Sequence, residues 1–213
     1  PIDTTQRAGS TFKMWERPIP GASYVIGSDP AEGLAHGDNS VSQVLRRMPD
    51  GMLRKVAVLV GKCDPDLFGK ETVAIAQEYN DAWIVAESNN HGMTMIRAMR
   101  ELAYPYLYSQ KAQVDMGQTE SRKWGWQTTG ATRPILVDGL VSAFREGLLD
   151  EVDYETLEEC VSFIVGPDGK AEAQSGCKDD RVMALGLAIQ GHLRCPLMGT
   201  IADPTAPSMP TLE

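Results

Sequence analysis

The sequence predicts an α/β fold with a mixed central β-sheet flanked by helices. Three closely spaced apolar segments between residues 24 and 61 are typical of successive strands. Beyond them, segments with helical apolar periodicity alternate with shorter apolar runs, as in folds whose helices alternate with strands. A chain of 213 residues, 42% of them hydrophobic, is large enough to bury one sizeable core.

The first three strands are expected at residues 24–28, 39–48 and 53–61. The first runs apolar up to Gly27, and the second alternates Val41, Gln43 and Leu45. The sequence Pro49-Asp50-Gly51 predicts a hairpin turn, so the second strand is expected to run antiparallel to its neighbours. The third, LRKVAVLVG, is almost entirely apolar, which favours a strand covered on both faces.

Helices and further strands follow in alternation. Helices are expected at 65–79, 89–104, 133–148 and 179–193, with a short one from 154 that leads into a hairpin turned at 167–169. Further strands are expected at 82–88 and 106–110. Residues predicted on inward helix faces include Met93, Ile96, Met99, Leu102, Leu136, Leu140, Val141, Phe144 and Leu148.

This order of elements, a meander of three strands followed by alternating helices and strands, is that of the ribonuclease H-like fold. We therefore expect a ribonuclease H-like domain over residues 22–194. Residues 1–21 are polar and contain Pro18 and Pro20, so they are interpreted as a linker or as the strand that leads into the domain. Residues 195–213 are rich in proline and lack periodicity, which predicts a flexible tail.

Composition excludes several classes of protein. The net charge of −9 argues against a simple polyanion binder, although acids gathered around divalent metals would give the same count. No apolar run approaches the roughly 18 residues of a membrane helix. The sequence has no GxxxxGK[ST] motif, so ATP hydrolysis is not expected here. The four cysteines lack CxxC spacing and are interpreted as reduced thiols.

Four acids occupy comparable places in the predicted fold. Asp29 ends the first strand, Glu87 ends the fourth, and Asp179 and Asp180 open the last helix. Carboxylates that close would repel one another, and divalent cations relieve that repulsion. Oxygen ligands suit Mg²⁺ or Mn²⁺, and two such ions could clamp a scissile phosphate. Taken singly, the Asp179-Asp180 pair could equally be a helix cap, and Glu87 a solvated strand end.

Basic residues form local clusters that are candidates for substrate binding. Trp124 and Trp126 beside them either stack on nucleic acid or anchor a loop. His91, like His36 and the turn residue Asp38, lies next to the acids, either as part of the site or as an ordinary loop residue. The candidate substrate-binding residues are Arg46, Arg47, Arg54, Lys55, Lys123, Arg133, Lys178 and His91.

The segments YVIGSDPAEG, WIVAESNNHG, GWQTTGATRPILVDGLVSAF and GKAEAQSGCKDDRVMALGLA resemble the C-terminal nuclease domain of the large terminase subunit of tailed bacteriophages. The resemblance spans residues 22–192. It implies a ribonuclease H-like fold, with the acids of the family's site at Asp29, Glu87, Asp179 and Asp180. Residues 128–134 match a segment interpreted as a substrate contact or a helix start. Many members carry His near the terminal acids, where this chain has Cys177 and Lys178.

The resemblance further implies a metal-dependent endonuclease that cuts concatemeric double-stranded DNA during packaging, with two Mg²⁺ or Mn²⁺ ions and little sequence specificity. The implied partners are DNA, a portal protein, a small terminase subunit and an upstream ATPase domain. The implied location is the cytoplasm of an infected bacterium, at the procapsid, and the isolated domain is expected to be monomeric. Two alternatives stay open: a resolvase-type or transposase-type nuclease on the same fold, and a non-catalytic module that binds DNA or the portal.

Overall fold

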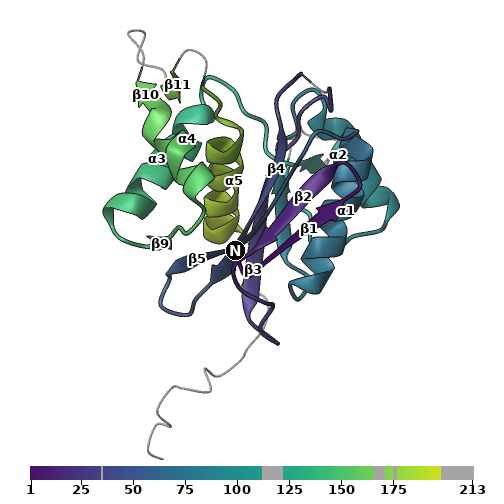
Figure 1. The fold of residues 1–213 in the computed structure, drawn as a ribbon, viewed down its shortest axis with the longest axis horizontal. Helices are drawn as coiled ribbons and strands as arrows, with labels where there is room; N and C mark the ends of the chain where they lie inside the picture. Colours follow the sequence, from purple (N-terminus) through teal and green to yellow (C-terminus); the bar gives the residue numbers. More distant parts are fainter. Residues whose placement is uncertain (35, 112–121, 166–170, 175–176, 198–213) are drawn as a thin grey trace, which may run out of the picture.

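The computed structural model describes residues 1–34, 36–111, 122–165, 171–174 and 177–197. Its centre is a sheet of seven strands, in which six follow the order β1-β2-β5-β4-β3-β6 and β9 pairs with β5 (Figure 1). The strands are β1 (Asp3–Arg7), β2 (Ser10–Met14), β3 (Ser23–Asp29), β4 (Ser40–Arg47), β5 (Leu53–Gly61), β6 (Trp83–Ala86) and β9 (Leu149–Asp150).

The middle of the sheet has the predicted topology. Strands β3, β4 and β5 form an antiparallel meander, and β6 runs parallel to β3. These strands are buried along nearly their whole length, as expected for a sheet with helices on both faces. The mixed α/β fold expected from the sequence is confirmed.

Residues 1–21 do not form a linker. Most of them build the hairpin β1–β2, and β2 pairs with β5 from Ser10↔Gly61 to Met14↔Ala57. The hairpin is the edge of the sheet, so β1 is exposed and carries little apolar signal. Phe12 is the exception, because it is only 2% exposed and packs in the core with α1.

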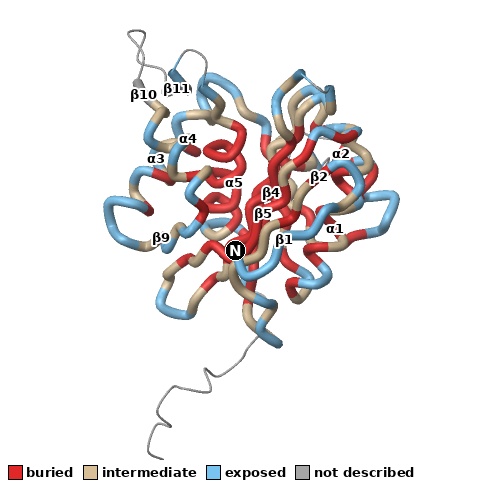
Figure 2. The backbone as a smooth tube through the Cα atoms, viewed as in Figure 1, coloured by how far each residue is buried: buried red, intermediate tan, exposed pale blue. Residues whose placement is uncertain are grey.

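Helices cover both faces of the sheet (Figure 1). Helices α1 (Pro65–Glu78) and α2 (Gly92–Glu101) lie on one face and share a core with β3, β5 and β6. Helix α5 (Asp180–Arg194) lies on the other face, and α3 (Arg133–Arg145) and α4 (Tyr154–Ser162) pack outside it. Figure 2 shows the most buried backbone in the sheet and in α5, which is therefore the central helix of its layer.

Helix α5 approaches β3 closely because β3 carries Gly27. A Cβ atom at this position would lie 2.0 Å from the carbonyl oxygen of Ala184 and 2.2 Å from the backbone nitrogen of Ala188. No side chain fits between the two backbones at this point, so strand and helix are in direct backbone contact. This contact fixes the distance between the end of β3 and the start of α5.

Several helix positions differ from prediction. Met93 and Leu102 on α2 and Val141 on α3 are about half exposed, at 54%, 49% and 53%, and Phe144 is 37% exposed. Ile96 and Met99 are buried on the inward face of α2 as predicted, and Met95 joins them there. The strand expected at 106–110 is present as a parallel bridge between Leu107 and Ile84 and as the start of a short strand at Ser109.

Two small ribbons lie outside the main sheet. After the Leu107 bridge, β7 (Ser109–Lys111) pairs with β8 (Arg122–Trp124). The hairpin predicted after α4 is present as β10 (Phe163–Val165) and β11 (Ala171–Ala173). Its expected turn at 167–169 lies outside the described residues. The ribbons extend the fold without joining the central sheet.

The domain continues a short way past residue 194. Cys195 is buried, and the carbonyl oxygens of Cys195 and Pro196 accept hydrogen bonds from the guanidinium of Arg47. Most of the segment predicted as a tail, residues 198–213, lies outside the described part of the chain. All four cysteines are free thiols, as predicted. Among the described helices, none combines the length and the apolar character needed to cross a membrane.

Candidate active site

Three elements deliver the four predicted acids to one edge of the sheet. Asp29 is the last residue of β3, and Glu87 directly follows β6. Because β3 and β6 are parallel, their carboxyl ends meet at the same edge, and the backbone N–H of Glu87 donates to the carbonyl oxygen of Ser28 at 2.8 Å. Asp179 and Asp180 reach this edge from the N-terminus of α5, which crosses the sheet at Gly27.

The four acids line one open cavity of about 360 Å³. The side chain of Asp180 is largely buried, whereas Asp29, Glu87 and Asp179 are partly exposed. Residues from the neighbouring loops complete the wall: Glu32, Asp38, Asn39, Asn89, Asn90, His91 and Arg133. The two strand ends and the helix start thus bring the four predicted acids to the wall of one cavity, and their role as site residues stays a prediction.

The electrostatics of the cavity reflect the crowding of carboxylates. Burial raises the pKa of Asp29 well above its ordinary value, and the charge of Glu87 and a hydrogen bond between the two carboxyl groups raise it further. Burial also raises the pKa of Asp180, against the lowering effect of the backbone N–H of Asn39, which donates to its Oδ2 at 2.9 Å. The described lining of this cavity carries more acidic than basic side chains, so fully ionised carboxylates would repel one another.

Two cations partly offset this charge. The guanidinium of Arg133 lies 2.6 Å from Oδ2 of Asp179, so Asp179 forms an ion pair rather than the helix cap considered above. The ammonium of Lys178 lies 3.4 Å from Asp38 and 3.8 Å from Asp180. Both cations were predicted as substrate-binding residues, and both stand at the acidic cavity.

The cavity fits divalent cations by its chemistry. As the described side chains stand, no three Asp, Glu, His or Cys residues are arranged to hold a metal ion. Instead, burial and the neighbouring charge of Glu87 hold the pKa of Asp29 well above its ordinary value, which favours retention of a proton in this crowded pair of acids. A cation that displaced this proton would relieve the repulsion, and a set of carboxylate ligands suits Mg²⁺ or Mn²⁺ better than zinc.

The predicted substrate-binding role of the β4–β5 hairpin residues is not supported, because they lie at the other end of the strands. Arg47 pairs with Ser23, whereas Asp29 pairs with Val41 at the site end. Arg47 is buried and binds backbone carbonyls after α5, and Lys55 is fully buried against Gln43 and Glu151. Arg46 and Arg54 contact Glu16, and Arg54 also contacts Asp150. Within the described residues, all four cations contact other parts of the fold, and none of them lines the acidic cavity.

Trp124 and Trp126 pack against the hydrophobic core. Trp126 is 2% exposed and pairs by a parallel bridge with Glu87, so it anchors the loop beside the site. Trp124 is partly buried, and the guanidinium of Arg100 lies 5.1 Å from its ring centroid. Lys123 is exposed on β8 and does not line the acidic cavity. The interpretation of the indoles as loop anchors is the one the structure favours.

Sequence reasoning missed two amides of the cavity wall. Asn39 precedes β4 and contacts Asp180 through its backbone, and Nδ2 of Asn89 donates to the carbonyl oxygen of Thr128 at 2.8 Å. Nδ2 of Asn89 also lies 3.4 Å from Oε1 of Glu87. Both could have been found by their position, since Asn39 directly precedes β4 and Asn89 lies three residues after β6, at the end of the sheet that carries Asp29.

These features define a ribonuclease H-like α/β domain with a carboxylate-lined cavity at the edge of its sheet. Solved structures with this fold include the large terminase nuclease from thermophilic phage G20c, determined with bound cobalt, at a TM-score of 0.65 and 19% identity over 88% of this chain and 89% of that one. The same nuclease with bound magnesium gives a TM-score of 0.65 and 18% identity over the same shares. The large terminase nuclease domain of Thermus phage P74-26 gives 0.62 and 18%, covering 91% of both chains.

The ribonuclease H-like fold implied by the sequence resemblance is thereby confirmed. No protein-family model and no curated protein matches the chain. The similarity is therefore one of three-dimensional structure, extending over nearly the whole described chain at low sequence identity.

Proposed function

We propose that this chain is the metal-dependent nuclease domain of a viral DNA-packaging terminase, which hydrolyses phosphodiester bonds of concatemeric double-stranded DNA with little sequence specificity. The observation that carries the proposal is the meeting of Asp29, Glu87 and the Asp179-Asp180 pair in one cavity. This carboxylate set stands in a fold shared with terminase nucleases that were solved with divalent metals bound. A purely structural module has no need of such mutually repelling acids.

The chain's own residues divide the chemistry between them. Asp29, Glu87 and Asp180, with Asp179 beside it, would hold two Mg²⁺ or Mn²⁺ ions. Such ions, when bound, activate a water molecule and stabilise the leaving oxygen of a phosphodiester. Arg133 fixes Asp179 by its ion pair and presents positive charge at the cavity wall, where it can attract a phosphate.

Residues at the rim orient and balance the acids. The backbone N–H of Asn39 and the ammonium of Lys178 hold the carboxylate of Asp180 from two sides. Asn89 lies beside Glu87 and ties the loop after β6 to the loop after Trp126. His91 lines the cavity directly before α2.

A plasmid-cutting assay with Mn²⁺ or Mg²⁺ tests the proposal. Asp29→Asn and Glu87→Gln keep the side-chain shapes but remove the charges that would bind metal, so each is expected to slow cutting by about 100-fold or more. Asp66→Asn on the exposed side of α1 is the matched control and should cut as fast as the parent. Unchanged cutting by Asp29→Asn would overturn the assignment.

The alternatives give different results in companion assays. Cleavage of branched DNA with linear duplex left intact would favour a resolvase-type nuclease. Absence of Mn²⁺ binding in calorimetry, with DNA affinity retained, would favour a non-catalytic module. In the proposed role, double-stranded DNA is the direct substrate, and the portal, the small subunit and an ATPase domain belong to the same packaging assembly in the cytoplasm of the infected cell.

A further inference from the structure

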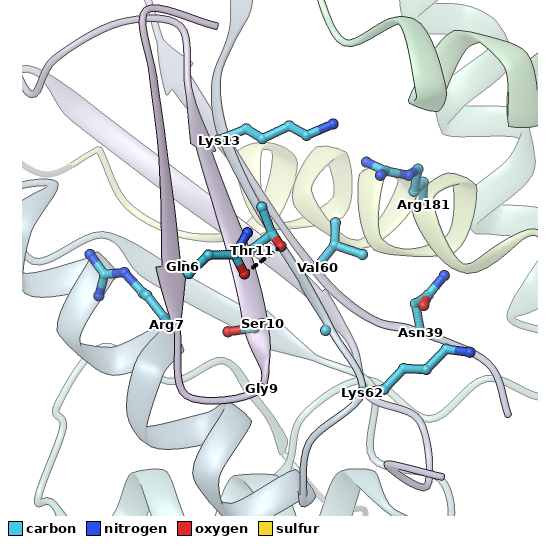
Figure 3. A pocket seen from close by; sticks show the side chains of 11 residues that line it. Gln6, Arg7, Gly9, Ser10, Thr11, Lys13, Asn39, Val60, Lys62 and Arg181 are labelled. Atoms are coloured by element: carbon cyan, nitrogen blue, oxygen red, sulfur yellow. Dashed lines mark hydrogen bonds between the residues drawn. The ribbon is translucent and has the colours of Figure 1, made fainter. Parts of the chain in front are cut away.

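A second cavity, of about 490 Å³, lies beside the acidic one, between the β1–β2 hairpin and the start of α5 (Figure 3). Its lining includes the cationic residues Arg7, Lys13, Lys62 and Arg181 but no acidic residue. The chain as a whole carries a net charge of −9, so this wall differs in sign from the average surface. We refer to this cavity as the basic groove.

The basic groove begins where the acidic cavity ends. Asn39 lines both cavities, and its backbone N–H donates to Asp180. Arg181, the residue after Asp180, forms part of the groove wall. Because Ser40 pairs with Gly61 in antiparallel register, Lys62 follows β5 at the strand end where Asn39 precedes β4. The two cavities are therefore consecutive along one edge of the molecule.

The groove walls are fixed by ion pairs. Lys13 on β2 lies opposite Arg181 in Figure 3, and both contact Glu155 on α4, at 2.5 Å and 3.4 Å. On the far side of the hairpin, Arg7 contacts Glu71 and Glu78 of α1. Lys62 differs from these three cations because it is exposed to solvent, just after β5. Thr11 also lines the groove, and its hydroxyl donates to Oε1 of Gln6 at 3.2 Å.

From this arrangement we propose that the basic groove binds the sugar-phosphate backbone of the DNA strand next to the scissile phosphate, with Lys62 as its main phosphate contact. The inference rests on the proposed nuclease function. A strand whose scissile phosphate lies over the acids must continue along the surface, and the lining of the groove offers it cationic donors. Contacts of this kind position a strand without reading its sequence.

Binding of a short fluorescent duplex in EDTA, measured over a salt series, tests the groove without metal-dependent cutting. Lys62→Glu is expected to weaken binding about 5- to 10-fold and to lower the slope of log K against log salt by about 1, as for the loss of one phosphate contact. Lys70→Glu, on exposed α1, changes the net charge equally and should bind like the parent. Thermal unfolding of both variants checks that each is folded at the temperature of the binding assay.

Two results would contradict DNA binding by the basic groove. One is a Lys62→Glu variant that binds like Lys70→Glu, and the other is a parent protein that does not bind the duplex. The catalytic assignment fails separately. If Asp29→Asn still cuts while Lys62→Glu loses binding, DNA binding by the groove is supported and the catalytic role of the assigned acids is contradicted. If Asp29→Asn stops cutting while Lys62→Glu binds normally, the catalytic role of the acids is supported and DNA binding by the groove is contradicted.

Discussion

Glu159 on α4 contacts the first turn of α5. Its Oε2 accepts the backbone N–H of Arg181 at 2.8 Å, and its Oε1 lies 3.5 Å from the guanidinium of the same residue. Burial raises the pKa of Glu159 to about 7, and the nearby charge of Asp180 adds to the shift, against the lowering effect of Arg181. A carboxyl group with a pKa of about 7 thus lies against the first turn of α5, close enough to Asp180 to feel its charge.

This shift makes stability depend on pH. The pKa is raised from 4.5 to about 7 on folding, so the folded state holds a proton that the unfolded state has lost, and Glu159 reduces the free energy of unfolding as pH rises through this window. Glu159→Gln removes that loss. The variant should gain stability relative to the parent between pH 5 and pH 8, by up to about 3 kcal/mol.

Chemical denaturation at a series of pH values measures the difference. Glu158→Gln, at the exposed neighbouring position, is the control and should show a difference from the parent that does not change with pH. A Glu159→Gln difference that is equally flat would contradict the burial argument.

At the scale of elements, the contact between α5 and β3 decides how the site is assembled. The helix lies on the strand at Gly27, two residues before Asp29, and touches it through Ala184, one turn after Asp180. Both obstructing atoms belong to the backbone of α5, so they cannot move aside as a side chain could.

Gly27→Ala should therefore be strongly destabilising. The added methyl group overlaps the helix backbone, and we expect a loss of at least about 2 kcal/mol in the free energy of unfolding, or failure to yield folded protein. Gly130→Ala is the matched control, since a Cβ there has no neighbour within 4 Å. Equal urea midpoints for the two variants would show that the close contact is not required.

The same elements show what the sequence could reveal. Asp29, Glu87 and Asp180 were predictable because each lies at a strand or helix end whose position follows from local apolar periodicity. Arg47 and Lys55 were misassigned because their partners, the carbonyls after α5 and Glu151, are about a hundred or more residues away along the chain. The local sequence predicts that a basic residue is exposed, because it does not show a partner that only the folded structure brings near.

The N-terminal hairpin was missed for a related reason. An edge strand has one unpaired side and needs few apolar residues. The sequence of β1 is therefore polar and cannot be distinguished from that of a linker. The inward faces of α2 and α3 were misjudged because the helix rotation depends on where the sheet lies, which periodicity alone does not give. Local pattern predicted the elements, and tertiary packing decided their edges and faces.

For the whole molecule, the candidate site lies where the sheet meets helix α5, which is also joined to the sheet by packing and by hydrogen bonds from Gln43 and Arg47. Its acids come from β3, β6 and α5, so a bound cation would link the sheet to the helix layer on one face. Mn²⁺ should therefore raise the melting temperature, with a stabilisation of about 2.7 kcal/mol at a hundred times its Kd.

Thermal unfolding with and without Mn²⁺ checks this expectation. In Asp29→Asn the rise caused by the metal should be reduced or lost, while the metal-free protein should melt higher than the parent because one repelling charge is gone. A rise of the same size in Asp29→Asn as in the parent would place the cation elsewhere on the molecule.

Helix α5 is fastened at both ends, by Glu159 at its first turn and by Arg47 at its last carbonyls. Between these fasteners it is a rod about 22 Å long, at 1.5 Å per residue. A rod held in this way transmits displacement rather than absorbing it. Cys195 and Pro196 lie just beyond the end of α5 that is remote from Asp180, so a displacement of the chain there would act on the helix that carries this carboxylate.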